Sequence, residues 1–202
     1  MPVIDGKYYD TDDTSWWDDL IDKVWPKQPP PPASPPPPAP PAAITPGTPQ
    51  DKLIQAQDAA RTNPAYKPHP PSNPDATFCN FATCDISKTV GAPMKDLYYG
   101  NRYALADEAA KQLANSSEWH EVLPKDAQNL ANQGTLVIGV QPNPYGHGHM
   151  VTVRPETMPG LAGSLGQAPI VNNIGEDRDV VPASQAFDKR LSRPRYYAPN
   201  KR

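Results

Sequence analysis

The sequence predicts an α+β protein in which N-terminal helices pack on a small antiparallel sheet. Segments with helical spacing fill residues 51–133, whereas short apolar runs typical of strands follow between residues 135 and 174. Helices grouped before strands are typical of α+β folds with helices on one face of the sheet. Proline, which accounts for 29 of 202 residues, is concentrated in residues 26–50, so a core must be built from about residue 70 onward.

Four helices are predicted before the strands, at residues 51–62, 78–90, 101–115 and 124–133. Asp75 or Thr77 is expected to cap the second helix, which Gly91-Ala92-Pro93 ends. The fourth helix has Pro124 at its start and Gly134 just past its end, the usual placement of these two residue types.

Three buried strands are predicted after the helices, at residues 135–140, 150–153 and 170–174. Each is a short apolar run rich in Val, Ile or Leu. A short helix at residues 183–188 is expected to close the domain. The basic residues 191–202 are expected to form a solvated tail.

Residues 1–25 form an acidic segment with seven aspartates, two lysines and three tryptophans. Within it, Trp17, Leu20, Ile21 and Val24 fall on one stripe of a short helix. Such a helix is marginal alone, so we interpret it as a docking peptide for a partner groove. The alternative is that it packs on its own domain. The Pro-rich linker of residues 26–50 favours polyproline II and spans about 75 Å when straight.

Charge and hydropathy exclude several classes of function. The net charge is −3 and the pI about 5.8, which gives no global attraction to nucleic acid. No apolar run has the length of a membrane span, so no membrane insertion is expected, and the first residues lack the features of a signal peptide. The two cysteines, Cys79 and Cys84, are poorly placed for a mutual disulfide and are expected to be reduced thiols.

Three segments carry a cysteine, a histidine and an asparagine in the sequence order that a thiol hydrolase needs. They are TFCNF at residues 77–81, GHGHMVTV at 146–153 and IVNNIG at 170–175. A cysteine opens a predicted helix, a histidine precedes an apolar strand, and an asparagine lies late in a second strand. Cysteine attacks as the thiolate, which a base and a helix N-terminus favour, and the base needs a third group to orient its ring.

These segments, together with ANQGTLVIGV at residues 131–140, resemble papain-like peptidoglycan hydrolases, namely the CHAP-type amidohydrolases and NlpC-type peptidases. The resemblance covers roughly residues 74–190, the expected hydrolase domain, and leaves residues 51–73 as a separate helix and loop. It implies a papain-like fold with the nucleophile on the first helix and the base and orienter on the sheet. The implied substrates are amide or peptide bonds of the bacterial cell wall.

The resemblance implies that Cys79 is the nucleophile, His149 the base and Asn173 the orienter. His147 and Asn172 remain alternatives for the base and the orienter. Asn80, His147, Asn172 and Trp119 are candidates for the cleft. For Trp119 the core or the cleft wall is expected, and a sugar platform is the alternative. Cys84 is expected to be an ordinary core thiol. The H-x-H pair has no matching ligand motif nearby, so neither a metal nor a cofactor is predicted.

The expected function is therefore a cysteine peptidase or amidase that cleaves peptidoglycan. Residues 1–25 are expected to hold a tail or portal protein of a phage virion, which delivers the enzyme to the host periplasm or cell wall. One alternative is an amidase effector of a secretion system. Another is a structural virion protein whose papain-like domain is inactive or only binds the wall.

Overall fold

The computed structural model describes residues 3–4, 7–8, 45–71, 77–146, 148–157 and 168–200. The chain divides into two units, Met1–Pro38 and Ala39–Arg202. In the first unit, β1 (Val3–Ile4) pairs antiparallel with β2 (Lys7–Tyr8). The helix predicted for docking and the Pro-rich linker as far as residue 44 lie outside the described residues.

The second unit is built on a six-stranded antiparallel sheet with the order β5-β10-β6-β7-β8-β9. In that order, the strands are β5 (Trp119–Val122), β10 (Arg195–Pro199), β6 (Ile138–Gln141), β7 (His149–Val153), β8 (Ile170–Ile174) and β9 (Arg178–Pro182). A separate two-stranded ladder joins β3 (Tyr98–Tyr99) to β4 (Arg102–Tyr103). The α+β class predicted from the sequence is confirmed.

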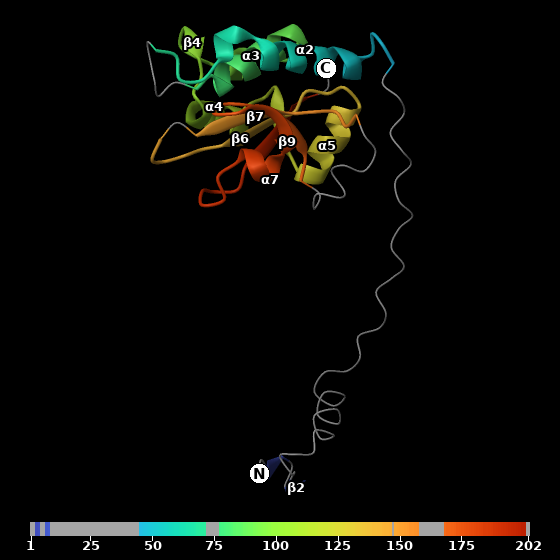
Figure 1. The fold of residues 1–202 in the computed structure, drawn as a ribbon, viewed down its shortest axis with the longest axis vertical. Helices are drawn as coiled ribbons and strands as arrows, with labels where there is room; N and C mark the ends of the chain where they lie inside the picture. The colour runs from blue at the N-terminus through green and yellow to red at the C-terminus, as the bar shows by residue number, and fades with distance from the viewer. Residues whose placement is uncertain are drawn as a thin grey trace. The chain divides into compact units, whose positions relative to one another are not determined.

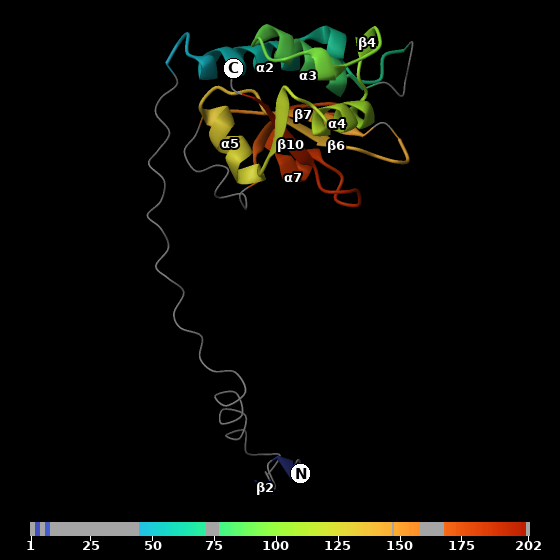
Figure 2. The same cartoon turned by 180° about the vertical axis from the view of Figure 1, so that it is seen from behind.

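Helices cover both faces of this sheet, so the expectation of helices on one face is wrong. One face packs against α2 (Pro49–Thr62), α3 (Cys79–Thr89) and α4 (Ala106–Ala114), with the short 3-10 helices η1 (Pro64–Tyr66) and η2 (Lys95–Leu97) beside them. The other face carries α5 (Pro124–Asn132) and α7 (Ala183–Ala186). Both cartoon views show α2 and α3 on one side of the sheet and α7 on the other (Figures 1 and 2).

Strand β7 shows how the two faces are filled. Because side chains alternate along a strand, Met150 packs among the residues of α2, α3 and α4, whereas Val151 and Val153 pack with Ala127 and Phe187 on the opposite face. The central strands β6, β7 and β8 are therefore buried on both sides, which agrees with the apolar runs that predicted them.

Helix α2 belongs to the compact domain rather than to a separate segment before it, so the boundary expected at residue 74 is wrong. Leu53 is fully buried in the core. The Gln57 amide donates hydrogen bonds to Thr152 Oγ1 at 3.0 Å and to the Val153 carbonyl at 2.9 Å. Arg154, at the end of β7, pairs with Asp58 at 3.0 Å. These contacts fix α2 against the centre of the sheet.

The segment expected to be a basic tail instead supplies an inner strand. Strand β10 lies between β5 and β6, and Tyr196, Tyr197 and Ala198 are buried. Arg195 stays at the surface and forms an ion pair with Glu121 on β5. The domain therefore extends past residue 190, as far as β10.

Several element boundaries also differ from the prediction. Helix α4 begins at Ala106 instead of residue 101, because residues 98–103 form the β3–β4 ladder around Gly100, whose φ is 63°. Strand β6 begins at Ile138 rather than residue 135, and α7 ends at Ala186. Strand β9 was not predicted.

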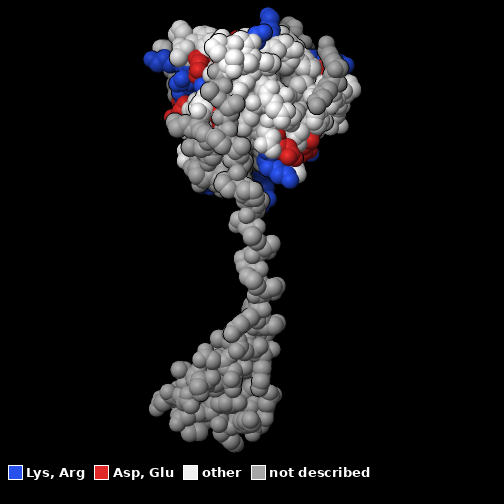
Figure 3. Space-filling model, turned by 90° about the vertical axis from the view of Figure 1, so that its right-hand side faces the viewer, with Lys and Arg blue, Asp and Glu red and all other residues white. Residues whose placement is uncertain are grey.

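Charged residues of both signs lie near one another on the face drawn in Figure 3, and uncharged residues cover most of the described part of it. Within the described ranges, no helix is long and apolar enough to cross a bilayer.

Candidate active site

Cys79 is the first residue of α3, and its side chain is nearly buried, with 7% exposure. The N-cap residue is Phe78, whose side chain cannot accept a hydrogen bond, so Thr77 does not cap this helix as expected. The first amides of a helix have no partner within the helix and carry its positive dipole end. Without a side-chain cap, they remain available to a thiolate or to an oxyanion beside Cys79.

His149 is the first residue of β7, where it pairs with Gln141 of β6. The chain reaches this position through Gly148, whose φ is 63°. A Cβ on Gly148 would lie 2.6 Å from the Gln141 carbonyl oxygen and 2.8 Å from Asp107 Oδ1, so the close approach requires glycine. The backbone path through Gly148 places the imidazole beside the start of α3.

Asn173 of β8 orients the imidazole. Its Oδ1 lies 2.8 Å from His149 Nε2, and because an amide oxygen only accepts, the ring donates its Nε2–H. The register that sets Thr152 opposite Asn172 puts Asn173 diagonally across from His149 on the same face. Gly175 leaves room for the ring, since a Cβ there would lie 2.8 Å from His149 Cε1. The ring nitrogen Nδ1 is thereby left for the thiol.

The interaction of Cys79 with His149 changes the proton affinity of both groups. Burial by itself raises the pKa of the Cys79 thiol, but the bond and charge of His149, with the backbone amides of Met150 and Asn80, hold that pKa below its ordinary value. Burial lowers the pKa of His149, but the thiol and Asn173 outweigh burial and raise it. These directions favour a thiolate–imidazolium pair.

The second cysteine, Cys84, has the opposite character. It is fully buried, and its sulfur lies 3.7 Å from the Leu97 carbonyl. Burial, with the nearby charges of Asp85 and Cys79, raises the pKa of the Cys84 thiol to about 12. Cys84 is a core thiol, as expected.

The structure brings Cys79, His149 and Asn173 together, whereas the other candidates lie elsewhere. Asn80 is buried and donates to the Ala104 carbonyl at 3.2 Å, so it ties the start of α3 to the chain before α4. Asn172 points to the opposite face of β8, where its amide atoms have no hydrogen-bond partner among the described residues. His147 lies outside the described residues.

Trp119 is a core residue, so its placement in the cleft is wrong. It is 2% exposed and packs with the residues of α2, α3 and α4. It also lies on β5, from which two strands, β10 and β6, separate His149 on β7. Of the two expected positions for this residue, the core is the correct one.

Two residues at the site were missed by the sequence analysis, Asp179 and Phe187. Asp179 lies on β9 and accepts a hydrogen bond from Asn173 Nδ2 at 3.1 Å. The Phe187 ring meets the His149 ring edge-on, with 5.8 Å between centroids. The short run Val180-Val181 was the signal in the sequence for the strand that carries Asp179.

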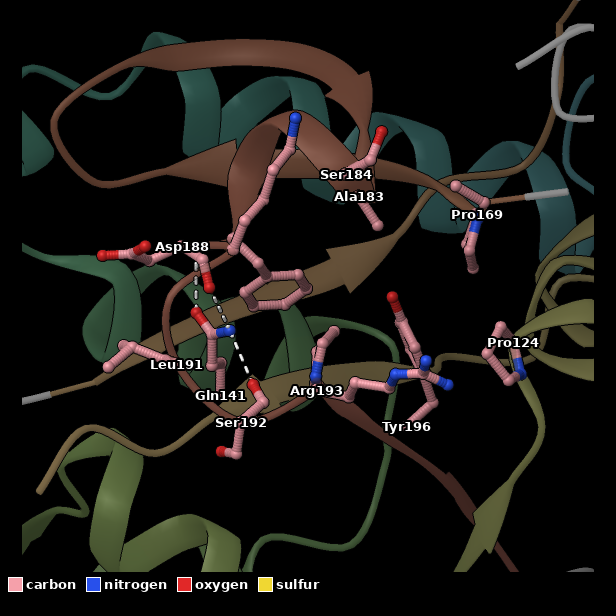
Figure 4. Close-up of a pocket in the computed structure, with 14 residues that line it drawn as sticks. Pro124, Gln141, Pro169, Ala183, Ser184, Asp188, Leu191, Ser192, Arg193 and Tyr196 are labelled. Carbon is pink, nitrogen blue, oxygen red and sulfur yellow. Dashed lines mark hydrogen bonds between the residues drawn. The ribbon is translucent and has the colours of Figure 1, made fainter. Parts of the chain in front are cut away.

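Phe187 also forms a wall of a pocket of about 580 Å³ on the sheet face that carries α5 and α7. Figure 4 shows Gln141 beneath this pocket, with its side chain directed at the loop after Phe187. The Gln141 amide donates to the carbonyls of Asp188 at 2.8 Å and Ser192 at 2.7 Å, and its oxygen accepts from the Asp188 amide at 2.9 Å. Gln141 is also the partner of His149 in the β6–β7 ladder. The same residue therefore contacts the loop after Phe187 and the first residue of β7.

Aromatic side chains surround the start of α3. The Phe81 ring is in edge-on contact with Phe78 and with Tyr103, at centroid separations of 6.1 and 5.5 Å, and Tyr103 contacts Tyr98. Phe81 is 45% exposed, although it lies only two residues from Cys79. Phe81 and its aromatic neighbours therefore form a partly exposed aromatic cluster on α3.

Within the described part of the chain, no group of three or more His, Cys, Asp or Glu side chains could hold a metal ion. The arrangement of Cys79, His149 and Asn173 can generate a nucleophilic thiolate with the side chains present. Comparison of the sequence with protein-family models and with curated proteins gives no match.

Proposed function

We propose that this chain is a cysteine hydrolase with a papain-like fold that cleaves amide bonds of peptidoglycan. The observation that carries the proposal is the chain of hydrogen bonds from the Cys79 thiol through the His149 imidazole to the Asn173 amide. It supplies a nucleophile, a base and a group that fixes the ring, on a helix and two adjacent strands.

The mechanism begins with the Cys79 thiolate, which attacks the carbonyl carbon of the scissile amide and forms a C–S bond. The carbonyl electron pair moves onto oxygen to give a tetrahedral oxyanion. Collapse of this species breaks the C–N bond, and His149 donates its proton to the departing amine. Water, deprotonated by His149, then attacks the thioester, and the C–S bond breaks to release the acid and regenerate the thiolate.

The start of α3 suits stabilisation of the oxyanion. The amides of its first turn have no side-chain cap, and the Asn80 amide already bonds the Cys79 sulfur. The backbone N–H of Cys79 lies at the same end of the helix, where the dipole favours negative charge. A developing oxyanion beside Cys79 therefore meets fixed donors at low reorganisation cost.

The substrate class rests on the resemblance of the Cys, His and Asn segments to cell-wall hydrolases and on an exposed aromatic cluster on the helix that carries Cys79. Exposed Phe81 and its aromatic neighbours offer flat apolar faces, against which sugar rings and peptide stems pack well. Delivery by a phage particle rests on residues 1–50, whose acidic, Trp-rich start and Pro-rich linker resemble a docking peptide on a spacer.

The test is digestion of purified peptidoglycan by the full chain, with the released fragments identified by mass spectrometry. We expect one type of new terminus, which names the bond that is cut, and no fragments from Cys79→Ala. The control is Cys84→Ala, which changes the other thiol of the same helix and should keep the cleavage pattern. Equal fragment release by Cys79→Ala and the wild type would disprove the proposal.

A further inference from the structure

The Asn173 side chain lies between two partners with opposite needs. Its Oδ1 accepts from His149 Nε2 at 2.8 Å, and its Nδ2 donates to Asp179 Oδ1 at 3.1 Å. Asn173 and Asp179 are direct partners in the β8–β9 ladder, so their side chains are neighbours on one face. The three groups form a line from β7 across β8 to β9.

An asparagine amide can rotate by half a turn with almost no change of shape, because its oxygen and its NH₂ group have similar size. In one orientation the oxygen accepts from the imidazole. In the other, the NH₂ group faces the imidazole N–H, and neither can accept. Asn173 therefore holds the ring only if something selects the first orientation.

Asp179 makes that selection. An ionised carboxylate only accepts hydrogen bonds, so it favours the orientation that turns the NH₂ group toward β9 and the oxygen toward the ring. The acidic residues of the turn before β9 are differently engaged, since Glu176 lies 2.5 Å from His69 Nε2 and Asp177 is exposed. Arg178 points to the carbonyls of Arg61 and Asn63 and leaves the Asp179 carboxylate to Asn173.

We propose that Asp179 is a positioning residue of the active site, which fixes the Asn173 amide and thereby keeps the proton of His149 on Nε2 and Nδ1 toward the thiol. The inference rests on the proposed function, because it assigns Asp179 a role in preparing the Cys79 nucleophile. Outer partners that orient a functional histidine typically contribute one to two orders of magnitude in metal sites, where this effect has been measured.

The experiment measures the rate of alkylation of Cys79 by iodoacetamide at pH 7 in the full chain, which requires no substrate. We expect Asp179→Ala to slow this rate roughly tenfold. Asp179→Asn should cause a smaller loss, because an amide oxygen can still accept from Asn173. The matched control is Asp177→Asn, two residues away in the exposed turn, which should label at the wild-type rate.

A double variant separates positioning from a structural role. In Asn173→Asp with Asp179→Asn, a carboxylate faces the imidazole and accepts in either orientation, so no orienting partner is needed. This double variant should regain most of the alkylation rate lost in Asp179→Ala. Nitrogen NMR of labelled histidine, recorded in the Cys79→Ala background at a pH where His149 is neutral, should show one Nε2–H tautomer of His149 with Asp179 in place and exchange of tautomers in Asp179→Ala.

The outcomes distinguish this inference from the proposed function. Wild-type Cys79 that labels no faster than Cys84 would reject the proposed function, and the inference with it. Fast labelling of the wild type, with an equal rate in a folded Asp179→Ala protein, would overturn the inference alone. If Asp179→Ala does not fold, Asp179→Leu, which has a similar shape and cannot accept a hydrogen bond, decides, and a wild-type rate together with a single His149 tautomer counts against positioning.

Discussion

At the scale of single residues, the two thiols of α3 show how position sets reactivity. Cys79 lies at the start of the helix beside His149, which holds its pKa below the ordinary value, whereas burial raises the pKa of Cys84 to about 12. At pH 7 the Cys84 thiolate is then populated in only about one molecule in 10⁵. We expect iodoacetamide to label Cys79 alone under native conditions, as read by peptide mass spectrometry. Labelling of both residues at the same slow rate would contradict this assignment.

His149→Ala tests the cause of the lowered pKa. Without the imidazole, burial remains the main influence on the Cys79 thiol and raises its pKa above the ordinary value. Each unit of increase lowers the thiolate fraction at pH 7 about tenfold. The alkylation rate should therefore fall at pH 7 and recover only in alkaline solution. The matched control is His120→Ala, at an exposed histidine that bonds Asn200, and its pH profile should match the wild type.

The sequence predicted the residues of the site that occupy recognisable positions along the chain. Cys79 opens a helix, His149 opens a strand, and Asn173 lies two residues before Gly175, positions that the resemblance to papain-like hydrolases singled out. Asp179 and Phe187 could not, because their roles depend on how β9 pairs with β8 and how the chain after α7 folds beneath β7. The cleft position proposed for Trp119 was wrong for the same reason, since no local pattern distinguishes a cleft wall from a core residue.

At the scale of elements, Gly175 shows how a strand end makes room for a catalytic ring. A Cβ at this position would lie 2.8 Å from His149 Cε1, so Gly175→Ala forces the imidazole to move. We expect a slower alkylation of Cys79, because Gly175 is buried just past the end of β8 and directly faces the ring. The control is Gly91→Ala, at a turn where an added Cβ meets no atom within 4 Å, and the φ of 74° there costs stability but leaves the site untouched.

Short strands at the C-terminal end were the elements that the sequence did not reveal. Strand β9 has charged residues at its start and Pro182 at its end, and β10 runs from Arg195 to Pro199. Such runs resemble loops, because only two or three apolar residues in each separate charged residues from proline. The pairing of β10 with both β5 and β6 is a long-range contact, which local pattern cannot supply.

Truncation tests the place of β10. A chain that ends at Arg190 loses a strand from the interior of the sheet and with it the buried Tyr196 and Tyr197, so cooperative thermal unfolding should disappear. A chain that ends at Asn200 keeps β10 and the Asn200 bonds to Ser117 and Glu118. This second chain should unfold at the wild-type temperature, as measured by circular dichroism. Normal unfolding of the chain that ends at Arg190 would show that β10 is dispensable.

At the scale of the whole molecule, the boundary of the compact unit decides what the N-terminal segment contributes. The unit begins at Ala39, and α2 supplies fully buried Leu53 and Gln57 to the core and the sheet. A chain that starts at Ala39 should therefore match the full chain in melting temperature and in Cys79 alkylation. A chain that starts at Pro74 lacks α2 and should be unfolded or strongly destabilised, since loss of a buried leucine alone costs about 2–5 kcal/mol.

The shortened chains also separate the cleavage of peptidoglycan from attachment to a particle. If residues 1–38 serve attachment to a particle, the chain from Ala39 should cleave purified peptidoglycan like the full chain but fail to co-purify with virions. A peptide of residues 1–30 should then retain the virion protein on its own in a pull-down. Leu53→Ala in the full chain provides the converse control, because it weakens the core while leaving the N-terminal segment intact. Loss of cleavage in a stably folded chain from Ala39 would show instead that the first unit takes part in catalysis.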